Sequence, residues 1–208
     1  MDFEVLVGFM LATAALAFSP GPDNIYVLMQ SMVNGKKYGL ATVAGLISGC
    51  LVHTSFLAFG VSAVIKRSDT LFFTIKLFGA IYLIYLAYRV FKSNGDIRLQ
   101  NNGVPQKSLL QLFRQGFIMN VLNPKVAIFF LAFFPGFLFS DTINTVVQFF
   151  VLGFLFMLVS FIVFALIAIL AGYISDFIKE NSNVGFYLKW LQILVFVGIA
   201  VYILISDK

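Results

Sequence analysis

Six long apolar segments, separated by short polar ones, constrain what this chain can fold into. An α-helix that rises 1.5 Å per residue needs roughly 17 to 25 apolar residues to cross about 30 Å of hydrocarbon. A soluble domain has a mostly polar surface, but 61% of these 208 residues are hydrophobic and only 11% are charged. We therefore predict an all-α integral membrane protein with six transmembrane helices, at residues 3–29, 39–64, 70–91, 115–139, 144–172 and 187–206.

The longest polar separator, residues 93–112, divides these six segments into two groups of three. We predict a single transmembrane domain, residues 1–208, built of two halves, 1–92 and 113–208, which the loop 93–112 connects. Because each half has an odd number of spans, the two halves cross the membrane in opposite directions. If the halves are copies, they form an inverted repeat.

Proline and glycine interrupt the first and the fourth segment, which open the two halves. Proline removes a backbone donor and clashes with the preceding turn, so helical hydrogen bonding fails there. Interrupted helices at matching positions of inverted repeats indicate a transporter's binding site. With a fourth helix that starts at Gln115, the second break lies closer to its helix start than the first, so a shared cavity stays an open question. The breaks are Ser19-Pro20-Gly21-Pro22-Asp23-Asn24 and Asn120-Val121-Leu122-Asn123-Pro124-Lys125.

The first break combines free backbone groups with a carboxylate. Inside hydrocarbon, unpaired backbone groups need a polar cavity or a ligand, and the helix that restarts at Asp23 or Asn24 directs its positive end there. A substrate carboxylate suits that end. Asp23 can bind an α-amino group, or alternate between protonated and charged forms in a proton-coupled step. The alternatives are a helix cap at Asp23 and a kink that only packs against its neighbours.

The second break supplies the matching cation. Lys125 follows Pro124 directly and, together with Asn120 and Asn123, can bind a carboxylate or pair with Asp23. The alternative is that the Lys125 ammonium snorkels to the nearby headgroups.

The second segment carries a face of small residues that ends in the only histidine. Gly45, Gly49 and His53 recur every four residues, so they share one face, and that face lets another helix come close. His53 can relay protons, or it can be a structural histidine bonded to a neighbouring helix. One histidine without a carboxylate or thiolate cluster predicts no metal site, and no motif indicates a cofactor.

The basic residues indicate topology rather than nucleic-acid binding. The net charge is +5, but the Lys and Arg residues lie scattered between apolar segments and form no dense patch. Most of them fall in alternate loops, which predicts that loops 30–38, 92–114 and 175–189 are cytoplasmic and that both termini lie outside. Asp2 and Glu4 precede the first segment without a Lys or Arg, so we expect a retained helix rather than a signal peptide.

The single cysteine, Cys50, limits the remaining function classes. It cannot form an intrachain disulfide, and a membrane thiol-electron carrier or assembly factor needs two exchanging thiols. A metal-cation exporter is the other alternative, although it needs several acidic, Cys or His ligands. No nucleophile elbow, carboxylate pair or phosphate loop is present, so we predict no enzyme activity.

Four short motifs follow one another from the first segment into the fourth: Phe18–Asn24, Asn34–Leu40, Lys76–Leu86 and Gly116–Lys125. Together they resemble the LysE/RhtB family of bacterial amino-acid exporters. The last two segments are generic hydrophobic sequence and add little to this resemblance.

The resemblance implies export of amino acids or close derivatives across the bacterial inner membrane, driven by proton exchange, with the lipid bilayer as surroundings. It places the site on Pro20, Gly21, Pro22, Asp23, Asn123, Pro124 and Lys125. Asp-Asn after the proline motif, together with His53, looks more like the branch that handles homoserine, threonine, leucine and other neutral amino acids than the basic-amino-acid branch. Whether the chain forms a homodimer stays open.

Overall fold

The computed structural model describes residues 3–65, 68–93, 107–181 and 183–205, and every regular element within these ranges is a helix. Four continuous helical segments are long and apolar enough to cross a membrane, and two bent helix pairs bring the number to six. The prediction of an all-α membrane protein with six spans is therefore confirmed. The four continuous spans are Lys36–Val61, Thr70–Lys92, Thr145–Ile169 and Val184–Ile205.

The first and fourth spans are the bent pairs, as predicted. The two helices of the first span meet at 61°, and those of the fourth meet at 51°. Pro22 and Pro124 each occupy the first turn of the restarting helix, where the missing N–H is not needed. The first span consists of α1 (Phe3–Phe18) and α2 (Pro22–Asn34); the fourth consists of α6 (Leu109–Val121), α7 (Pro124–Phe133) and the short turn η2 (Phe134–Phe137).

The fourth span begins six residues earlier than Gln115, so that predicted boundary is wrong. Ser108 accepts a hydrogen bond from the backbone N–H of Gln111, and the Gln111 side chain accepts one from the backbone of Ser108. This capping box starts the helix although polar residues follow. As a result, α6 and α2 each have 13 residues. The two breaks therefore lie at similar distances, about 20 Å along the helix, from the same end of the bundle.

The second span is α3 (Lys36–Phe56), which continues through a π-helical turn η1 (Leu57–Val61) into α4 (Ser62–Ile65). The remaining helices are α5 (Asp69–Lys92), α8 (Thr145–Ile169), α9 (Ala171–Glu180) and α10 (Val184–Ile205).

The predicted polar separators are more helical than expected. Within 30–38 only Gly35 is outside a helix, and its φ of +99° is one that L side chains rarely adopt. Helices α9 and α10 cover most of 175–189, because polar residues can continue a helix beyond the apolar layer. Residues 94–106 of the predicted loop 93–112 lie outside the described residues.

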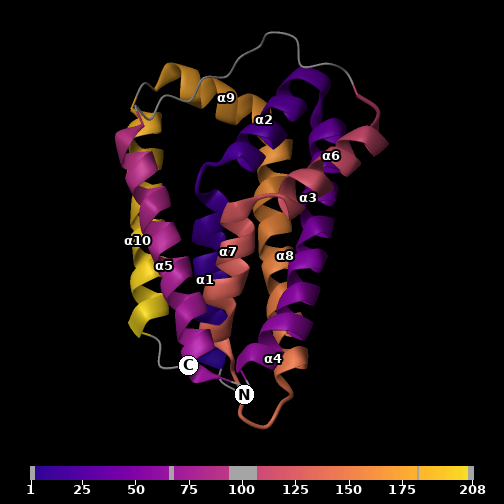
Figure 1. Cartoon of the computed structure of the whole chain (residues 1–208). Helices are drawn as coiled ribbons and strands as arrows, with labels where there is room; N and C mark the ends of the chain where they lie inside the picture. The colour runs from indigo at the N-terminus through magenta and orange to yellow at the C-terminus, as the bar shows by residue number, and fades with distance from the viewer. Residues whose placement is uncertain (1–2, 66–67, 94–106, 182, 206–208) are drawn as a thin grey trace.

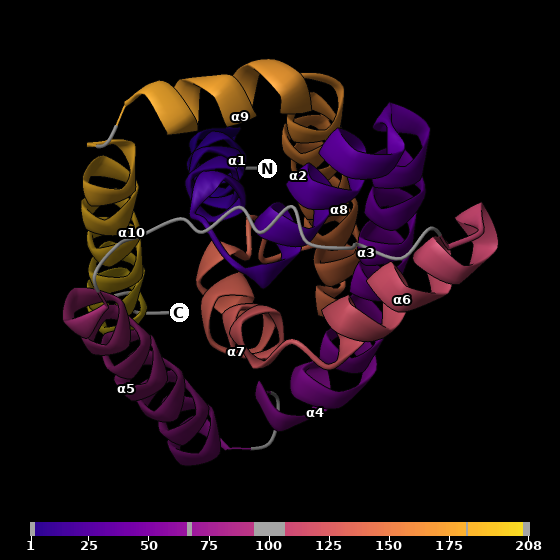
Figure 2. The ribbon, with the colours of Figure 1, turned by 90° about the horizontal axis from the view of Figure 1, so that it is seen from above.

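The two ends of the helical bundle carry different segments of the chain (Figure 1). The start of α1 and the end of α10 lie at one end, here called the terminal end; the turn between α2 and α3 at Gly35, the start of α6 and helix α9 lie at the other, here called the Gly35 end. Helices α5 and α10 pack together along one edge, while α3 packs against α6 and α8 on the opposite side (Figure 2). Helix α3 packs against α6, and α8 packs against α1. The inverted repeat itself stays a prediction.

Phenylalanines of α7 and η2 form the core beside the breaks. The rings of Phe130 and Phe134 stack at 4.1 Å, and those of Phe129 and Phe133 stack at 4.4 Å. Phe9 from α1 meets Phe134 edge-on at 5.0 Å. Ring packing of this kind stabilises a rigid contact between α1 and α7, so each break leaves a firmly packed half-helix at the terminal end.

Helices α3 and α6 approach through glycine, as the small face predicts. A Cβ added at Gly45 would lie 2.0 Å from the carbonyl oxygen of Phe113. One added at Gly116 would lie 2.4 Å from the carbonyl oxygen of Thr42. Neither helix can therefore accept even a methyl group at this crossing. The tight crossing holds α6, the half-helix that precedes the second break, in place.

We expect Gly45→Ala to lower the apparent unfolding temperature of the purified protein by about 5 °C, because the two backbones must separate to admit the methyl group. Gly198→Ala on α10 is the matched control, since a Cβ there would meet nothing within 4 Å. Thermal unfolding in detergent, followed by light scattering or tryptophan fluorescence, measures both. Equal unfolding temperatures for the two variants would show that the crossing is not tight.

Candidate functional site

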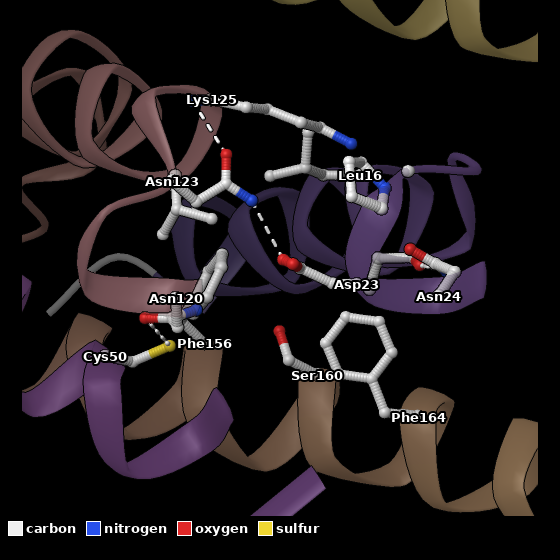
Figure 3. Close-up of a pocket in the computed structure, with 14 residues that line it drawn as sticks. Leu16, Asp23, Asn24, Cys50, Asn120, Asn123, Lys125, Phe156, Ser160 and Phe164 are labelled. Atoms are coloured by element: carbon white, nitrogen blue, oxygen red, sulfur yellow. Dashed lines mark hydrogen bonds between the residues drawn. The ribbon is translucent and has the colours of Figure 1, made fainter. Parts of the chain in front are cut away.

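The two breaks meet at one cavity inside the bundle (Figure 3). Residues of α1, α2, α3, α6, α7 and α8 line it, together with Asn123 between α6 and α7 and Gly21 ahead of α2. The open question left by the sequence is thereby answered: both breaks line the same cavity. The lining residues are Leu16, Ala17, Gly21, Pro22, Asp23, Asn24, Cys50, Asn120, Asn123, Lys125, Val126, Phe156, Ser160 and Phe164.

Asn123 joins the two breaks. Its Nδ2 donates a hydrogen bond of 2.9 Å to Oδ2 of Asp23, which is buried with 7% of its surface exposed. Its Oδ1 accepts a bond of 3.0 Å from the backbone N–H of Lys125 and so caps α7. One side chain therefore starts the second half-helix and also holds the carboxylate of the first break.

The Lys125 ammonium lies at the first break, not at an end of the bundle. Its Nζ is 3.5 Å from the carbonyl oxygen of Ser19 and 5.1 Å from the centre of the Phe196 ring. A Cβ added at Gly21 would be 3.7 Å from the same nitrogen. The interpretation that Lys125 snorkels toward headgroups is therefore wrong, because its side chain turns inward toward α2.

The amino-terminal end of α2 opens onto the cavity without a side-chain cap. Its N-cap residue is Gly21, which has no side-chain oxygen, and Pro22 has no N–H. Asn24 does not cap this end either, since its Nδ2 donates to the carbonyl oxygen of Ala17 at 2.7 Å and ties the two half-helices together. The uncapped end gives the cavity a partial positive charge beside the Lys125 ammonium.

Asn120 and Cys50 form the wall where α6 meets α3. The Cys50 thiol is 3.7 Å from Oδ1 of Asn120 and 3.6 Å from the carbonyl oxygen of Leu46. A Cβ at Gly49 would lie 2.7 Å from Oδ1 of Asn120, so the buried amide packs directly against the α3 backbone. The Cys50 thiol and the Asn120 amide oxygen therefore face each other across the α3–α6 contact.

Sequence reasoning missed the wall that α8 contributes. Phe156, Ser160 and Phe164 are spaced by four residues and so present one face of α8 to the cavity. The fifth segment reads as generic hydrophobic sequence, but Ser160 is the only polar residue of α8 after Gln148. That isolated hydroxyl is the signal that the sequence offered.

Four predicted site residues do not line the cavity. Ser19, Pro20 and Pro124 shape the breaks, and Ser19 contributes only its carbonyl oxygen toward Lys125. His53 lies outside the lining: its Nε2 is 3.1 Å from the carbonyl oxygen of Asn120, and its ring lies 5.4 Å from that of Phe130. A carbonyl oxygen only accepts, so Nε2 carries a proton in this contact.

Comparison with known proteins identifies the family. The LysE type translocator family model matches residues 14–207, which is nearly the whole chain. The chain belongs to the LysE family of translocators. Two curated relatives, from Salmonella typhimurium and Salmonella typhi, bear the name homoserine/homoserine lactone efflux protein. Each is 31% identical over 179 residues, which are 86% of this chain and 86% of the relative. No solved structure matches the chain at a significant level.

This LysE-family chain is thus a multi-pass membrane transporter of amino-acid type, and the resemblance stated from four motifs is confirmed. Among the described residues, no group of three or more His, Cys, Asp and Glu side chains lies close enough to hold a metal ion. The cavity has a volume of about 40 Å³. That is room for about three water molecules, so an amino acid enters only when the walls move apart.

The position of His53 favours a structural role over proton relay in this LysE-family chain. We expect His53→Gln, which keeps a donor for the Asn120 carbonyl oxygen, to retain most of the export rate and the same response to an imposed proton gradient as the wild type. His53→Leu removes this bond and leaves the Asn120 carbonyl oxygen with the 3.0 Å bond from the backbone N–H of Asn123, so we expect the protein's stability and the export rate to fall together, by at most a few-fold. Transport assays at two external pH values compare the export rates of the two variants, and an immunoblot measures the protein level of each. A gradient-independent His53→Gln variant would restore the relay hypothesis.

Proposed function

We propose that the chain exports neutral amino acids, or close derivatives such as homoserine and its lactone, in exchange for protons. The observation that supports this most is the placement of one carboxylate and one ammonium on opposite breaks of a single cavity. Asp23 comes from the first break and Lys125 from the second, and Asn123 holds them in one frame. A free amino acid carries the complementary pair of charges.

The proposed binding mode follows from these charges. The substrate ammonium binds Asp23, which is acceptor-only when ionised. The substrate carboxylate binds the Lys125 ammonium and the uncapped amino-terminal end of α2, since both attract an anion. The substrate then replaces the contact of Lys125 with the Ser19 carbonyl oxygen, which at 3.5 Å is weak.

Proton exchange uses the same carboxylate. A proton on Asp23 removes the charge that attracts the substrate ammonium, so proton and substrate compete for one group. Loading a proton from outside releases the amino acid there, and losing that proton to the cytoplasm prepares Asp23 for the next substrate. A carboxylate buried between two broken helices suits this alternation, because ionisable groups within spans are commonly functional.

The two halves, 1–92 and 113–208, are the proposed moving bodies. Alternating access requires the half-helices at each end of the cavity to part in turn. Helices α2 and α6 at the Gly35 end and α1 and α7 at the terminal end supply two such sets. The bends of 61° and 51° at the breaks are the proposed hinges.

The proposed orientation places the Gly35 end in the cytoplasm of a bacterial cell and both termini outside. Basic side chains gather at the Gly35 end, which is the arrangement that the positive-inside rule predicts for the inner membrane. Described examples at that end are Lys36, Lys37, Lys107, Arg114 and Lys189.

Release of amino acid from loaded cells tests the proposed function. Bacteria that express the chain are loaded with dipeptides containing homoserine, threonine, leucine or lysine, and the external amino acids are measured over time. We expect several-fold faster release of the neutral amino acids than from cells with an empty vector, no effect on lysine, and loss of the difference when an uncoupler removes the proton gradient. Release of lysine alone, or of none of them, would contradict the proposal.

A further inference from the structure

Ser160 of α8 presents a buried hydroxyl that has no hydrogen-bond partner in the structure. Its side chain is 2% exposed, and its Oγ makes no hydrogen bond. Ser160 lines the cavity, and Figure 3 shows its oxygen turned from α8 toward the side that holds Asp23. A buried hydroxyl left without a partner destabilises a protein by about 1–3 kcal/mol. A serine at this position therefore needs a functional reason.

Other hydroxyls in the spans have a simple solution that Ser160 does not use. They donate to the carbonyl oxygen four residues earlier in the same helix, which satisfies them without any ligand. The residues that do so are Thr42, Ser48, Thr54, Ser62 and Thr74. For Ser160 the corresponding acceptor is the carbonyl oxygen of Phe156, but its Oγ makes no hydrogen bond, and Figure 3 shows it directed from α8 toward the side of Asp23.

Among the described residues, Ser160 is also the only unpartnered hydroxyl that lines this cavity. The other buried hydroxyls without a partner are Thr13, Ser19, Ser31 and Ser175, and none of them is part of the cavity wall. Burial alone therefore does not mark Ser160. Burial, the missing partner and the position in the cavity occur together only there.

The neighbours of Ser160 determine which groups of a ligand its hydroxyl can contact. Phe156 and Phe164 lie one turn on either side of it along α8, so the hydroxyl sits between two apolar rings. Across the cavity lie the charged groups, Asp23 and Lys125. An amino acid held by those charges directs its side chain toward α8, where it meets apolar surface and one hydroxyl.

We propose that Ser160 selects the substrate by hydrogen bonding to a side-chain oxygen. The substrates it favours are amino acids with a short side chain that bears one hydroxyl, such as homoserine and threonine, over apolar ones of the same size. This inference rests on the proposed function and adds to it the residue that sets the preference. A site that pairs its own hydroxyl with that of the substrate rejects an analogue without one, because the protein hydroxyl is then left unpaired.

Competition in everted membrane vesicles tests this. Uptake of radiolabelled homoserine is inhibited by unlabelled threonine or by valine, which has nearly the same shape but no hydroxyl. For the wild type we expect threonine to compete at about three- to tenfold lower concentration than valine. In Ser160→Ala the two half-inhibitory concentrations should become equal, whereas Ser160→Thr, which keeps the hydroxyl, should retain a preference for threonine.

Ser175→Ala is the matched control, because Ser175 is also 2% exposed and unpartnered but lies on α9 outside the cavity. It should keep the wild-type ratio. Uptake by the wild type with equal competition by threonine and valine, or a preference that persists in Ser160→Ala, would overturn the role of Ser160 and leave the proposed function intact. Failure of the wild type to take up any neutral amino acid would instead refute the proposed function, and the inference with it.

Discussion

Replacing Asp23 with asparagine should lower the rate of gradient-driven amino-acid export at least about 30-fold, the loss typical of removing one partner of a buried charged contact. Asparagine has nearly the same shape, and its amide oxygen can still accept the hydrogen bond from Asn123. The fold of the breaks should therefore survive. What disappears is the negative charge that binds the substrate ammonium and accepts the exchanged proton.

Uptake into everted vesicles that carry an imposed pH difference measures this effect, with protein level checked by immunoblot. Asp141→Asn is the control, because Asp141 is an exposed aspartate in the turn that precedes α8. It should leave uptake unchanged. If Asp23→Asn vesicles took up amino acid as fast as the wild type, and still responded to the pH difference, Asp23 would have no part in binding or coupling.

Lys125→Met should weaken the binding of amino acids much more than the binding of their lactones. Methionine keeps most of the apolar stem but removes the cation proposed to bind the substrate carboxylate. Homoserine carries that carboxylate and homoserine lactone does not. We therefore expect the apparent affinity for homoserine to fall at least about 30-fold, and that for the lactone to change by less than about threefold.

Competition against a labelled substrate gives both affinities in one set of vesicles, and their ratio removes any general effect on protein level. Lys37→Met, an exposed lysine at the start of α3, is the control and should keep both affinities. An equal loss for homoserine and lactone would mean that Lys125 only supports the structure through Ser19 and Phe196.

The sequence predicted the breaks and the close helix face well, because both depend on local chemistry. Pro22 and Pro124 can only interrupt or start a helix, and apolar length sets the number of spans. The spacing of Gly45, Gly49 and His53 predicted a close neighbour, and the structure shows α6 there: Gly45 meets Phe113, and Gly49 and His53 meet Asn120.

The sequence could not predict contacts between side chains that are far apart along the chain. The bond from Asn123 to Asp23 joins residues 100 positions apart, and the Lys125 ammonium meets a carbonyl from the other half. Whether Lys125 faced the cavity or the headgroups depended on where the fourth helix begins. That boundary was misplaced because hydropathy gave more weight to Arg114 and Gln115 than to the capping box at Ser108.

The contribution of α8 was hidden for a related reason. Hydropathy treats Ser160 as a minor interruption of an apolar span, although one hydroxyl decides the chemistry of that wall. Only the structure shows that its partner is absent and that it faces the same cavity as Asp23.

Solute counterflow in proteoliposomes most directly tests whether both breaks form one substrate site. Purified protein is reconstituted, the vesicles are filled with unlabelled homoserine, and a trace of labelled homoserine is added outside with no proton gradient. The wild type and Asp141→Asn should accumulate label transiently, whereas Asp23→Asn and Lys125→Met should each accumulate almost none. Counterflow at the wild-type rate in either of the last two variants would contradict a site shared between the breaks.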